Sequence, residues 1–156
     1  MKAIAACDKN FAIGNRGSLL CHIPGDLKFF KEKTLGNTVI MGRKTLESLP
    51  GGKPLPKRET IIVSKSLEST DAYKVAKSIE EAVSMCEGKD AFVCGGETIY
   101  RQMLPYCDEV FLTHIDEEFE ADAWFPELTD DFEKVWESDI QEEKGHRYQF
   151  VQYKRK

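Results

Sequence analysis

Two short segments place glycine between an apolar run and a helix-forming stretch, an arrangement that can bind anions. They are Val39-Ile40-Met41-Gly42-Arg43-Lys44-Thr45 and Phe92-Val93-Cys94-Gly95-Gly96-Glu97-Thr98. The free N–H groups at the start of a helix point outward, and glycine leaves room for a phosphate. Each segment alone is weak evidence of a phosphate site, because a glycine at such a turn is often needed only for the backbone conformation. Neither segment matches the Rossmann or the Walker pattern. Together they indicate a ligand whose phosphates bridge two loops, as in a dinucleotide, and Ser64-Lys65 adds a third cationic loop.

Asp26 is the candidate proton-handling residue. It lies in the first turn of an expected helix, where an acidic residue commonly interacts only with the helix dipole. Here Ile23, Leu27, Phe29 and Phe30 flank it with apolar side chains. A carboxyl group in an apolar pocket has a raised pKa and can take part in proton transfer, so both interpretations stay open.

Arg58 is a candidate for binding a carboxylate. It follows the Pro- and Gly-rich segment 50–56 and stands at the start of an expected strand. A guanidinium group at such a position can bind a carboxylate through two parallel hydrogen bonds. An ordinary surface arginine fits the local sequence as well.

The cysteines and histidines are not expected to form a metal site or a disulfide framework. The five cysteines are odd in number and widely spaced, and the three histidines form no zinc-binding pattern. Reduced cysteines in the cytoplasm are the expectation, with no metal. The adjacent Cys21 and His22 lack a third orienting group, which argues against a thiol nucleophile.

Charge is unevenly distributed along the 156 residues. The net charge is −5, and residues 116–143 hold 13 acidic residues and one basic residue, a net charge of −12. The rest of the chain carries +7 and can therefore contain an anion site, although a solvated acidic loop explains the division equally well. The negative total argues against general nucleic-acid binding, and the longest apolar run, five residues, is too short for a membrane span.

Alternating apolar strands and helices predict the elements that must position these residues. We expect strands at 2–7, 38–41, 59–64, 91–94 and 109–115. One helix is expected to start at Pro24, and three more are expected at 43–49, 78–87 and 97–104. Residues 136–140 and 148–154 are expected to pair as an antiparallel hairpin. The predicted fold is one α/β domain, 1–156, with a mainly parallel sheet, a C-terminal antiparallel hairpin and about four flanking helices.

The whole chain resembles the dihydrofolate reductase family of the single-domain bacterial or phage type. The most specific matches are the run Met41-Gly42-Arg43-Lys44-Thr45 and the pair Gly95-Gly96 followed by Ile99-Tyr100. The matching segments, in the order of the family, are 4–6, 12–14, 23–30, 39–48, 54–56 with Arg58, 61–64, 95–100, 112–115 and 125–126. The resemblance implies a central mixed, mostly parallel eight-stranded sheet with a C-terminal antiparallel hairpin and about four flanking helices.

The resemblance implies NADPH-dependent reduction of 7,8-dihydrofolate to tetrahydrofolate, with hydride transfer to pterin C6 and protonation at N5, in support of one-carbon metabolism and thymidylate synthesis. It makes Asp26, braced by Thr113, the catalytic group at the pterin, and it makes Arg58 the clamp for the glutamyl α-carboxylate. The substrate-binding residues that it implies are Ile4, Ala5, Leu27, Phe30, Leu49, Leu55, Arg58, Cys94 and Thr113.

The same resemblance implies an NADPH site. Arg43, Ser64 and Lys65 are expected at the 2′-phosphate, a cis peptide is expected between Gly95 and Gly96, and residues 9–20 are expected to form a mobile lid. The implied cofactor-binding residues are Ala6, Ile13, Gly14, Leu19, Gly42, Arg43, Lys44, Thr45, Ser64, Lys65, Cys94, Gly95, Gly96, Glu97, Thr98, Ile99 and Tyr100. We expect a cytoplasmic monomer with dihydrofolate and NADPH as its small-molecule ligands and no nucleic-acid or membrane partner.

The sequence departs from the family pattern before the Asp26 helix, where Leu20-Cys21 replaces the usual Pro-Trp. This change leaves open a folate- or NADPH-binding protein that has lost catalysis. A separate alternative is a reductase of the same fold that acts on the pyrimidine of riboflavin synthesis. Arg58 and the apolar stretch 27–30 argue against the pyrimidine reductase.

Overall fold

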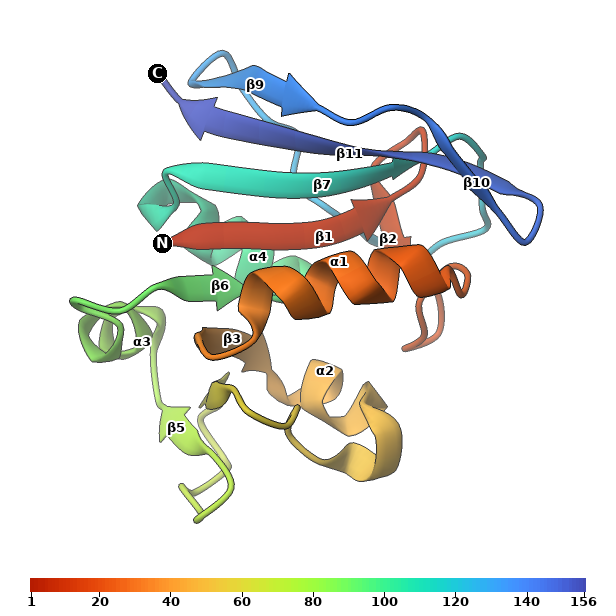
Figure 1. Cartoon of the computed structure of the whole chain (residues 1–156). Coiled ribbons are helices and arrows are strands. Elements are labelled where there is room, and N and C mark those ends of the chain that lie inside the picture. Colours follow the sequence, from red (N-terminus) through yellow and green to blue (C-terminus); the bar gives the residue numbers. More distant parts are fainter.

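A twisted central sheet is the main element of the computed structural model, which describes residues 1–156 (Figure 1). Eight strands follow one another in the order β10-β11-β7-β1-β6-β3-β4-β5, and β9 pairs with β11 outside this row. The six strands from β7 to β5 are parallel, while β11 runs antiparallel to β7. The strands are β1 (Lys2–Cys7), β2 (Ala12–Gly14), β3 (Thr38–Gly42), β4 (Glu59–Val63), β5 (Lys74–Ala76), β6 (Ala91–Val93), β7 (Glu109–Ile115), β8 (Ala123–Trp124), β9 (Phe132–Glu137), β10 (Gln141–Glu143) and β11 (His146–Arg155).

Four α-helices cover the sheet. They are α1 (Pro24–Thr34), α2 (Arg43–Ser48), α3 (Ile79–Met85) and α4 (Glu97–Met103), and two short 3₁₀ turns, η1 (Pro50–Gly52) and η2 (Leu104–Tyr106), follow α2 and α4. Ser78 begins α3, because its hydroxyl accepts a hydrogen bond from the Glu81 N–H at 3.1 Å. Ser78 and Glu81 have the spacing of a capping box, but only half of it forms, since the Glu81 carboxylate accepts from the Lys77 N–H and not from the Ser78 N–H. No helix has the length and apolar character needed to cross a membrane.

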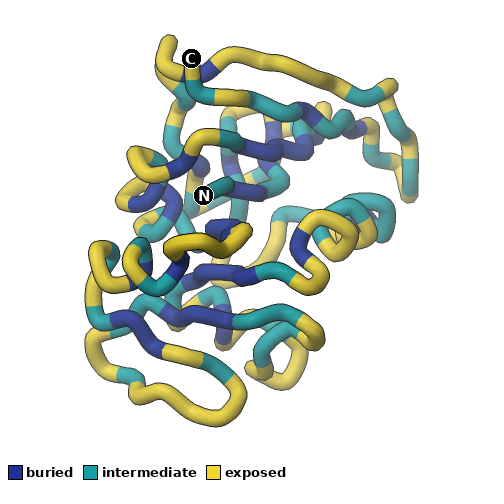
Figure 2. Tube along the Cα trace, turned by 60° about the vertical axis from the view of Figure 1, so that its left-hand side comes forward, coloured by how far each residue is buried: buried dark blue, intermediate teal, exposed yellow.

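The parallel strands bury side chains on both faces of the sheet. Along β3, Ile40 joins the large core on the α3 and α4 side, whereas Val39 and Met41 pack with Leu46 of α2 on the opposite side. This alternation explains why the β3 sequence is apolar at consecutive positions. Figure 2 shows that buried residues follow these central strands, while exposed residues dominate the outer connections.

The expected mainly parallel sheet with a C-terminal antiparallel hairpin is confirmed. β1 and β7 have the expected bounds, and the other expected strands and helices differ from theirs by a few residues at most. In the hairpin, Trp136 and Glu137 pair with Gln152 and Val151, although β9 starts earlier than expected, at Phe132. The short strands β2, β5, β8 and β10 were not expected, because two or three residues carry no readable periodicity.

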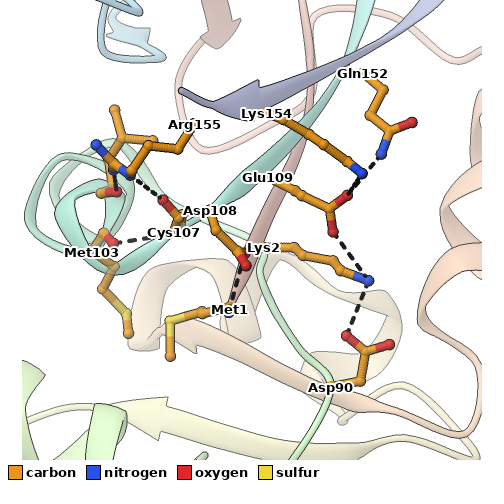
Figure 3. A network of polar contacts seen from close by, with 11 residues as sticks. Met1, Lys2, Asp90, Met103, Cys107, Asp108, Glu109, Gln152, Lys154 and Arg155 are labelled. Atoms are coloured by element: carbon orange, nitrogen blue, oxygen red, sulfur yellow. Dashed lines mark hydrogen bonds and ion pairs between the residues drawn. The ribbon is translucent and has the colours of Figure 1, made fainter. Parts of the chain in front are cut away.

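Charged groups tie the two chain ends together at the amino-terminal edge of the parallel strands (Figure 3). The Met1 amine lies 3.5 Å from Asp108 Oδ1, and the Asp108 backbone bonds both Met1 and Arg155. Nearby, Glu109 pairs with Lys2 at 3.5 Å and with Lys154 at 3.6 Å. This network leaves the opposite, carboxyl-terminal edge of the strands to the candidate functional residues.

Candidate active site

Asp26 is held at the start of α1 by a contact with β7. The buried Thr113 hydroxyl donates a 2.6 Å hydrogen bond to Asp26 Oδ1. Burial raises the pKa of Asp26, and the Thr113 hydrogen bond opposes that rise. The site therefore contains a carboxyl group that favours its protonated form more than a solvated aspartate does.

Apolar side chains extend along α1 from Asp26. Leu27 is 41% exposed although it lies on a helix with an apolar face, and Phe30 is half-buried against the Ile4, Phe92 and Phe111 cluster. The exposed part of Leu27 leaves apolar surface beside the Asp26 carboxyl group, and a flat apolar ligand could cover it. The predicted wall residues Leu49 and Leu55 are half-buried.

The Arg58 side chain is hydrogen-bonded to the C-terminal end of α1. Its Nη1 donates to Thr34 Oγ1 at 3.1 Å, and its Nε donates to the Pro56 carbonyl at 3.0 Å. No carboxylate of the chain forms an ion pair with it, and partial burial lowers its pKa. Thr34 and Asp26 are eight residues apart on α1, about 12 Å along the helix axis. A carboxyl group and an arginine without an acidic partner therefore stand at opposite ends of one partly apolar helix.

The two strand–glycine–helix junctions meet, as expected for neighbouring parallel strands. The Gly42 N–H donates to the Gly95 carbonyl at 2.9 Å, and a cis peptide links Gly95 to Gly96, which confirms that expectation. A Cβ atom built at Gly95 would lie 3.4 Å from Thr45 Oγ1, and one at Gly42 would lie 3.2 Å from Ile99 Cγ1. The absence of side chains at these glycines leaves the starts of α2 and α4 close to each other.

A hollow of about 580 Å³ lies where β4 and β5 end, beside α3 and α4. Its lining includes the predicted Ser64 and Lys65 and two cations that sequence reasoning missed, Lys77 and Arg101. Lys77 was missed because the strand before it, β5, was not expected. The predicted Arg43 does not line this hollow; it is exposed on α2, with its Nε 3.6 Å from Glu47.

The remaining predicted cofactor residues of α4 have different surroundings. Tyr100 is 5% exposed, belongs to the main core and donates a 2.6 Å hydrogen bond to the Ile4 carbonyl. Glu97 forms a 2.8 Å ion pair with Arg101, and Thr98 is exposed. The predicted Lys44 is also exposed, and Cys94 is half-buried beside the Gly95 junction.

The predicted lid, residues 9–20, is attached to the segment around Asp122. The Asp122 N–H donates to the Gly14 carbonyl and its Oδ2 accepts from the Arg16 N–H, both at 3.0 Å. Ile13 and Ala6 are half-buried, and Leu19 is 65% exposed. The base of the lid is fixed by the buried Asp8, whose carboxylate accepts hydrogen bonds from the N–H groups of Asn10 and Ala12.

Cys21 has the properties of a packing residue. Burial raises its pKa to about 11, so the thiolate needed for nucleophilic attack is scarce at neutral pH. It packs against the cluster of Ile23, Ile115 and Tyr148. No three metal-ligating side chains are grouped in a way that could hold an ion.

Comparison with known proteins gives consistent matches over the full chain. The family model of dihydrofolate reductase matches residues 1–155. The dihydrofolate reductase of Neisseria meningitidis serogroup B is 42% identical, with 97% of this chain and 96% of that protein covered. That of Bacillus subtilis is 38% identical, covering 98% and 93%. Among solved structures, dihydrofolate reductase from Enterococcus faecalis in complex with NADP(H) superimposes with a TM-score of 0.89 at 36% identity, over 99% of this chain and 95% of that one.

Proposed function

The chain belongs to the dihydrofolate reductase family and is an NADPH-dependent oxidoreductase that reduces 7,8-dihydrofolate, and we propose that it does so through the residues gathered around α1. The observation that carries this assignment of residues is the arrangement of Asp26, Leu27 and Phe30, and Arg58 along α1. It matches an elongated ligand with hydrogen-bond donors at one end, aromatic rings in the middle and a carboxylate at the other end.

In the proposed binding mode, the Asp26 carboxylate accepts hydrogen bonds from pterin N3 and the 2-amino group. Thr113 holds Asp26 Oδ1 in place from β7. Leu27, Phe30, Leu49 and Leu55 pack against the pterin and p-aminobenzoyl rings, while Arg58 binds the glutamyl α-carboxylate through its guanidinium group. Arg58 and Leu27 are available for such contacts, since Arg58 forms no ion pair and Leu27 is 41% exposed.

Asp26 supports protonation of pterin N5 without touching that atom. It helps protonation through the pterin to which it is hydrogen-bonded and through an ordered water, and the burial that raises its pKa favours such sharing of a proton. The Thr113 hydroxyl fixes the orientation of the carboxyl group by donating to Oδ1, and the remaining lone pairs of the two oxygens can accept hydrogen bonds from the ligand.

The residues at the two glycine junctions fit NADPH. Because Gly42 and Gly95 lack side chains, a pyrophosphate can approach the free N–H groups at the starts of α2 and α4. Ser64 and Lys65 line the hollow at the end of β4, where the basic side chain suits the 2′-phosphate that separates NADPH from NADH. Arg43 is exposed and paired only with Glu47, so we propose that it turns toward this phosphate. NADPH, when bound, supplies the hydride for pterin C6.

The lid over residues 9–20 excludes water from the reacting rings. Gly17 has a φ of +78° and open space around it, which lets the loop change shape at this point. The hydrogen bonds to Asp122 hold the loop against the β8 segment. Closure of such a loop strengthens electrostatic interactions at the site and prevents side reactions.

The chain is proposed to work as a single domain and a monomer in the cytoplasm, with no nucleic-acid partner. The acidic stretch 116–143, with its net charge of −12, disfavours contact with a polyanion. Sedimentation of the purified protein with and without NADPH tests the oligomeric state.

The decisive assay mixes the protein with NADPH and dihydrofolate and follows the loss of NADPH absorbance. We expect turnover that a 2,4-diaminopyrimidine inhibitor abolishes, and much weaker turnover with NADH. A pyrimidine intermediate of riboflavin synthesis is the control substrate and is expected to be inert. Absence of turnover by the folded protein at every pH from 5 to 8, together with tight inhibitor binding, would instead indicate a non-catalytic binding protein.

A further inference from the structure

The helix that carries Asp26 receives its N-terminal cap from a residue far away in the sequence. Ile23 precedes α1 and has no side chain that can accept a hydrogen bond, so the first turn lacks the usual cap. Instead, Glu143 Oε1 accepts a 2.7 Å hydrogen bond from the Gly25 N–H. Figure 1 shows the β10–β11 hairpin, which carries Glu143, at the same end of the molecule as the start of α1.

Gly25 is required at this place for space and not for backbone conformation. It has no positive φ, yet a Cβ atom at this position would collide with Tyr148 Oη and lie 3.1 Å from Glu143 Oε1. The Tyr148 hydroxyl therefore packs directly on the first turn of α1. Burial, and then the neighbouring Glu143 carboxylate, raise the pKa of Tyr148, in agreement with the close approach of these two groups.

We propose that Glu143 is a positioning residue for the Asp26 carboxyl group, acting through the N-terminal turn of α1. The inference rests on the proposed role of Asp26 in the reduction. Two contacts from different strands then define the position of Asp26: Thr113 of β7 holds its side chain, and Glu143 of β10 holds the backbone one residue before it. The two strands that make these contacts are joined through β11, which pairs with β7 on one side and with β10 on the other. The position of β10 relative to β7 is therefore set by the pairing of β11 with each of them.

The electrostatic character of the contact adds to its strength. A carboxylate at a helix N-terminus interacts favourably with the helix dipole, and a hydrogen bond to a charged acceptor is about twice as strong as a neutral one. Removing Glu143 leaves the Gly25 N–H to water and loosens the turn in which Asp26 stands. We therefore expect a lower kcat/KM for dihydrofolate and unchanged binding of NADPH, whose proposed site lies on α2 and α4.

The test compares Glu143→Ala, Glu143→Gln and the control Glu142→Ala. Glu142 is the adjacent, exposed residue of the same strand and pairs only with Arg147, so its removal perturbs the hairpin without touching α1. We expect Glu143→Ala to lower kcat/KM for dihydrofolate by roughly 3- to 30-fold, in the range of a lost helix cap, with an unchanged Kd for NADPH. Glu143→Gln keeps an oxygen acceptor and should recover most of the loss, and Glu142→Ala should resemble the parent protein.

Equal values of kcat/KM for Glu143→Ala and the parent protein would overturn the inference, and so would an equal loss in Glu142→Ala. A second readout is independent of turnover: the hydrogen exchange of the Gly25 amide in the ligand-free protein. We expect faster exchange in Glu143→Ala and parent-like exchange in Glu142→Ala, whereas unchanged protection in Glu143→Ala would contradict the cap itself. If the parent protein showed no turnover, the proposed function would fail while this exchange measurement still decided whether Glu143 caps α1.

Discussion

The Asp26 carboxyl group, the proposed proton-handling residue, stands in surroundings that cost stability. Its surroundings raise its pKa, and the only side chain that hydrogen-bonds it is the neutral Thr113. The charged form is therefore poorly compensated, which suits a group that assists proton transfer.

Asp26→Asn should reduce dihydrofolate turnover by about 10²- to 10⁴-fold at pH 7, the usual range for an acid–base group. Activity should recover partly at low pH, where the substrate is already protonated in solution. NADPH absorbance, followed from pH 5 to 8, measures both effects. An unchanged rate at pH 7 would show that another group does this work.

The same substitution should stabilise the folded protein at neutral pH. A carboxyl group whose pKa is raised on folding binds more protons in the folded than in the unfolded state, so the free energy of unfolding falls as pH rises from its ordinary pKa of 3.8 through the raised value. Asp26→Asn removes this loss and still accepts the Thr113 hydrogen bond. We expect a higher Tm than that of the parent protein at pH 7.5 and a smaller difference at pH 4.5, with Asp71→Asn at an exposed position as the control.

Thr60 offers a second test at the level of one side chain. It is buried in β4, and its hydroxyl has no hydrogen-bond partner. Thr60→Val keeps the shape and removes the unpaired group, so we expect the free energy of unfolding to rise by about 1 kcal/mol in urea titrations. Thr38→Val is the matched control and should destabilise, because the Thr38 hydroxyl donates to Glu59 at 3.2 Å.

At the scale of elements, the contact between the two glycine junctions is the most constrained feature. Gly95 has a φ of +121°, which strains any residue with a side chain, whereas Gly96 has a φ of −86°. Gly95→Ala should lower the free energy of unfolding by about 1–3 kcal/mol. Gly96→Ala should cost much less stability, because its Cβ would make only an ordinary 3.6 Å contact with Thr45.

Both alanine variants should weaken NADPH binding, since each places a methyl group where the pyrophosphate is proposed to approach. Urea unfolding and fluorescence titration with NADPH separate the two effects. Equal stability of the two variants would contradict the role assigned to the backbone conformation of Gly95.

The elements that the sequence predicts best are those with a strong local pattern. β1 and β7 are apolar runs bounded by polar residues, and Pro24 and Ser78 mark the starts of their helices. The strands β2, β5, β8 and β10 exist because longer neighbours offer them hydrogen bonds, a tertiary effect that local sequence does not contain.

The site residues that the sequence predicts are likewise those with a local pattern, and the ones it misses depend on tertiary contacts. Asp26 stands out from its apolar flanks, and the junction glycines from their strand–turn–helix pattern. Local sequence could not predict that Glu143 caps a helix 118 residues earlier, because the contact depends on how β10 pairs with β11. Nor could it predict Lys77 beside Lys65, since their proximity requires β5 to lie next to β4.

On the scale of the whole molecule, the sheet separates a binding edge from a structural edge. The candidate ligand residues follow the carboxyl ends of the parallel strands, while Figure 3 shows the network at the opposite edge. Arg155 closes this edge, because its Nε donates to the Cys107 carbonyl at 3.0 Å and its Nη2 donates to the Leu104 carbonyl at 2.9 Å.

Arg155→Ala should therefore lower the free energy of unfolding by about 1.5–3 kcal/mol, the usual range for hydrogen bonds to a charged group. It should also lose the packing of the guanidinium group on the Phe132 ring, 4.5 Å from its centroid. Lys156→Ala, at an exposed neighbouring position, is the control, and urea unfolding of both variants measures the difference. A loss of stability in the control equal to that in Arg155→Ala would contradict this account.

The position of the two chain ends suggests a practical use. Met1 and Arg155 both bond the backbone of Asp108, one on each side of β7, so they are separated by about two strand spacings, roughly 10 Å. A linker of a few glycine and serine residues could bridge that gap and yield a circularly permuted polypeptide with new ends in an exposed loop such as the one around Glu68 and Asp71. Reporter proteins fused at these relocated ends would stand near the hollow lined by Ser64 and Lys65, where the 2′-phosphate is proposed to bind, an arrangement suited to an optical sensor of NADPH.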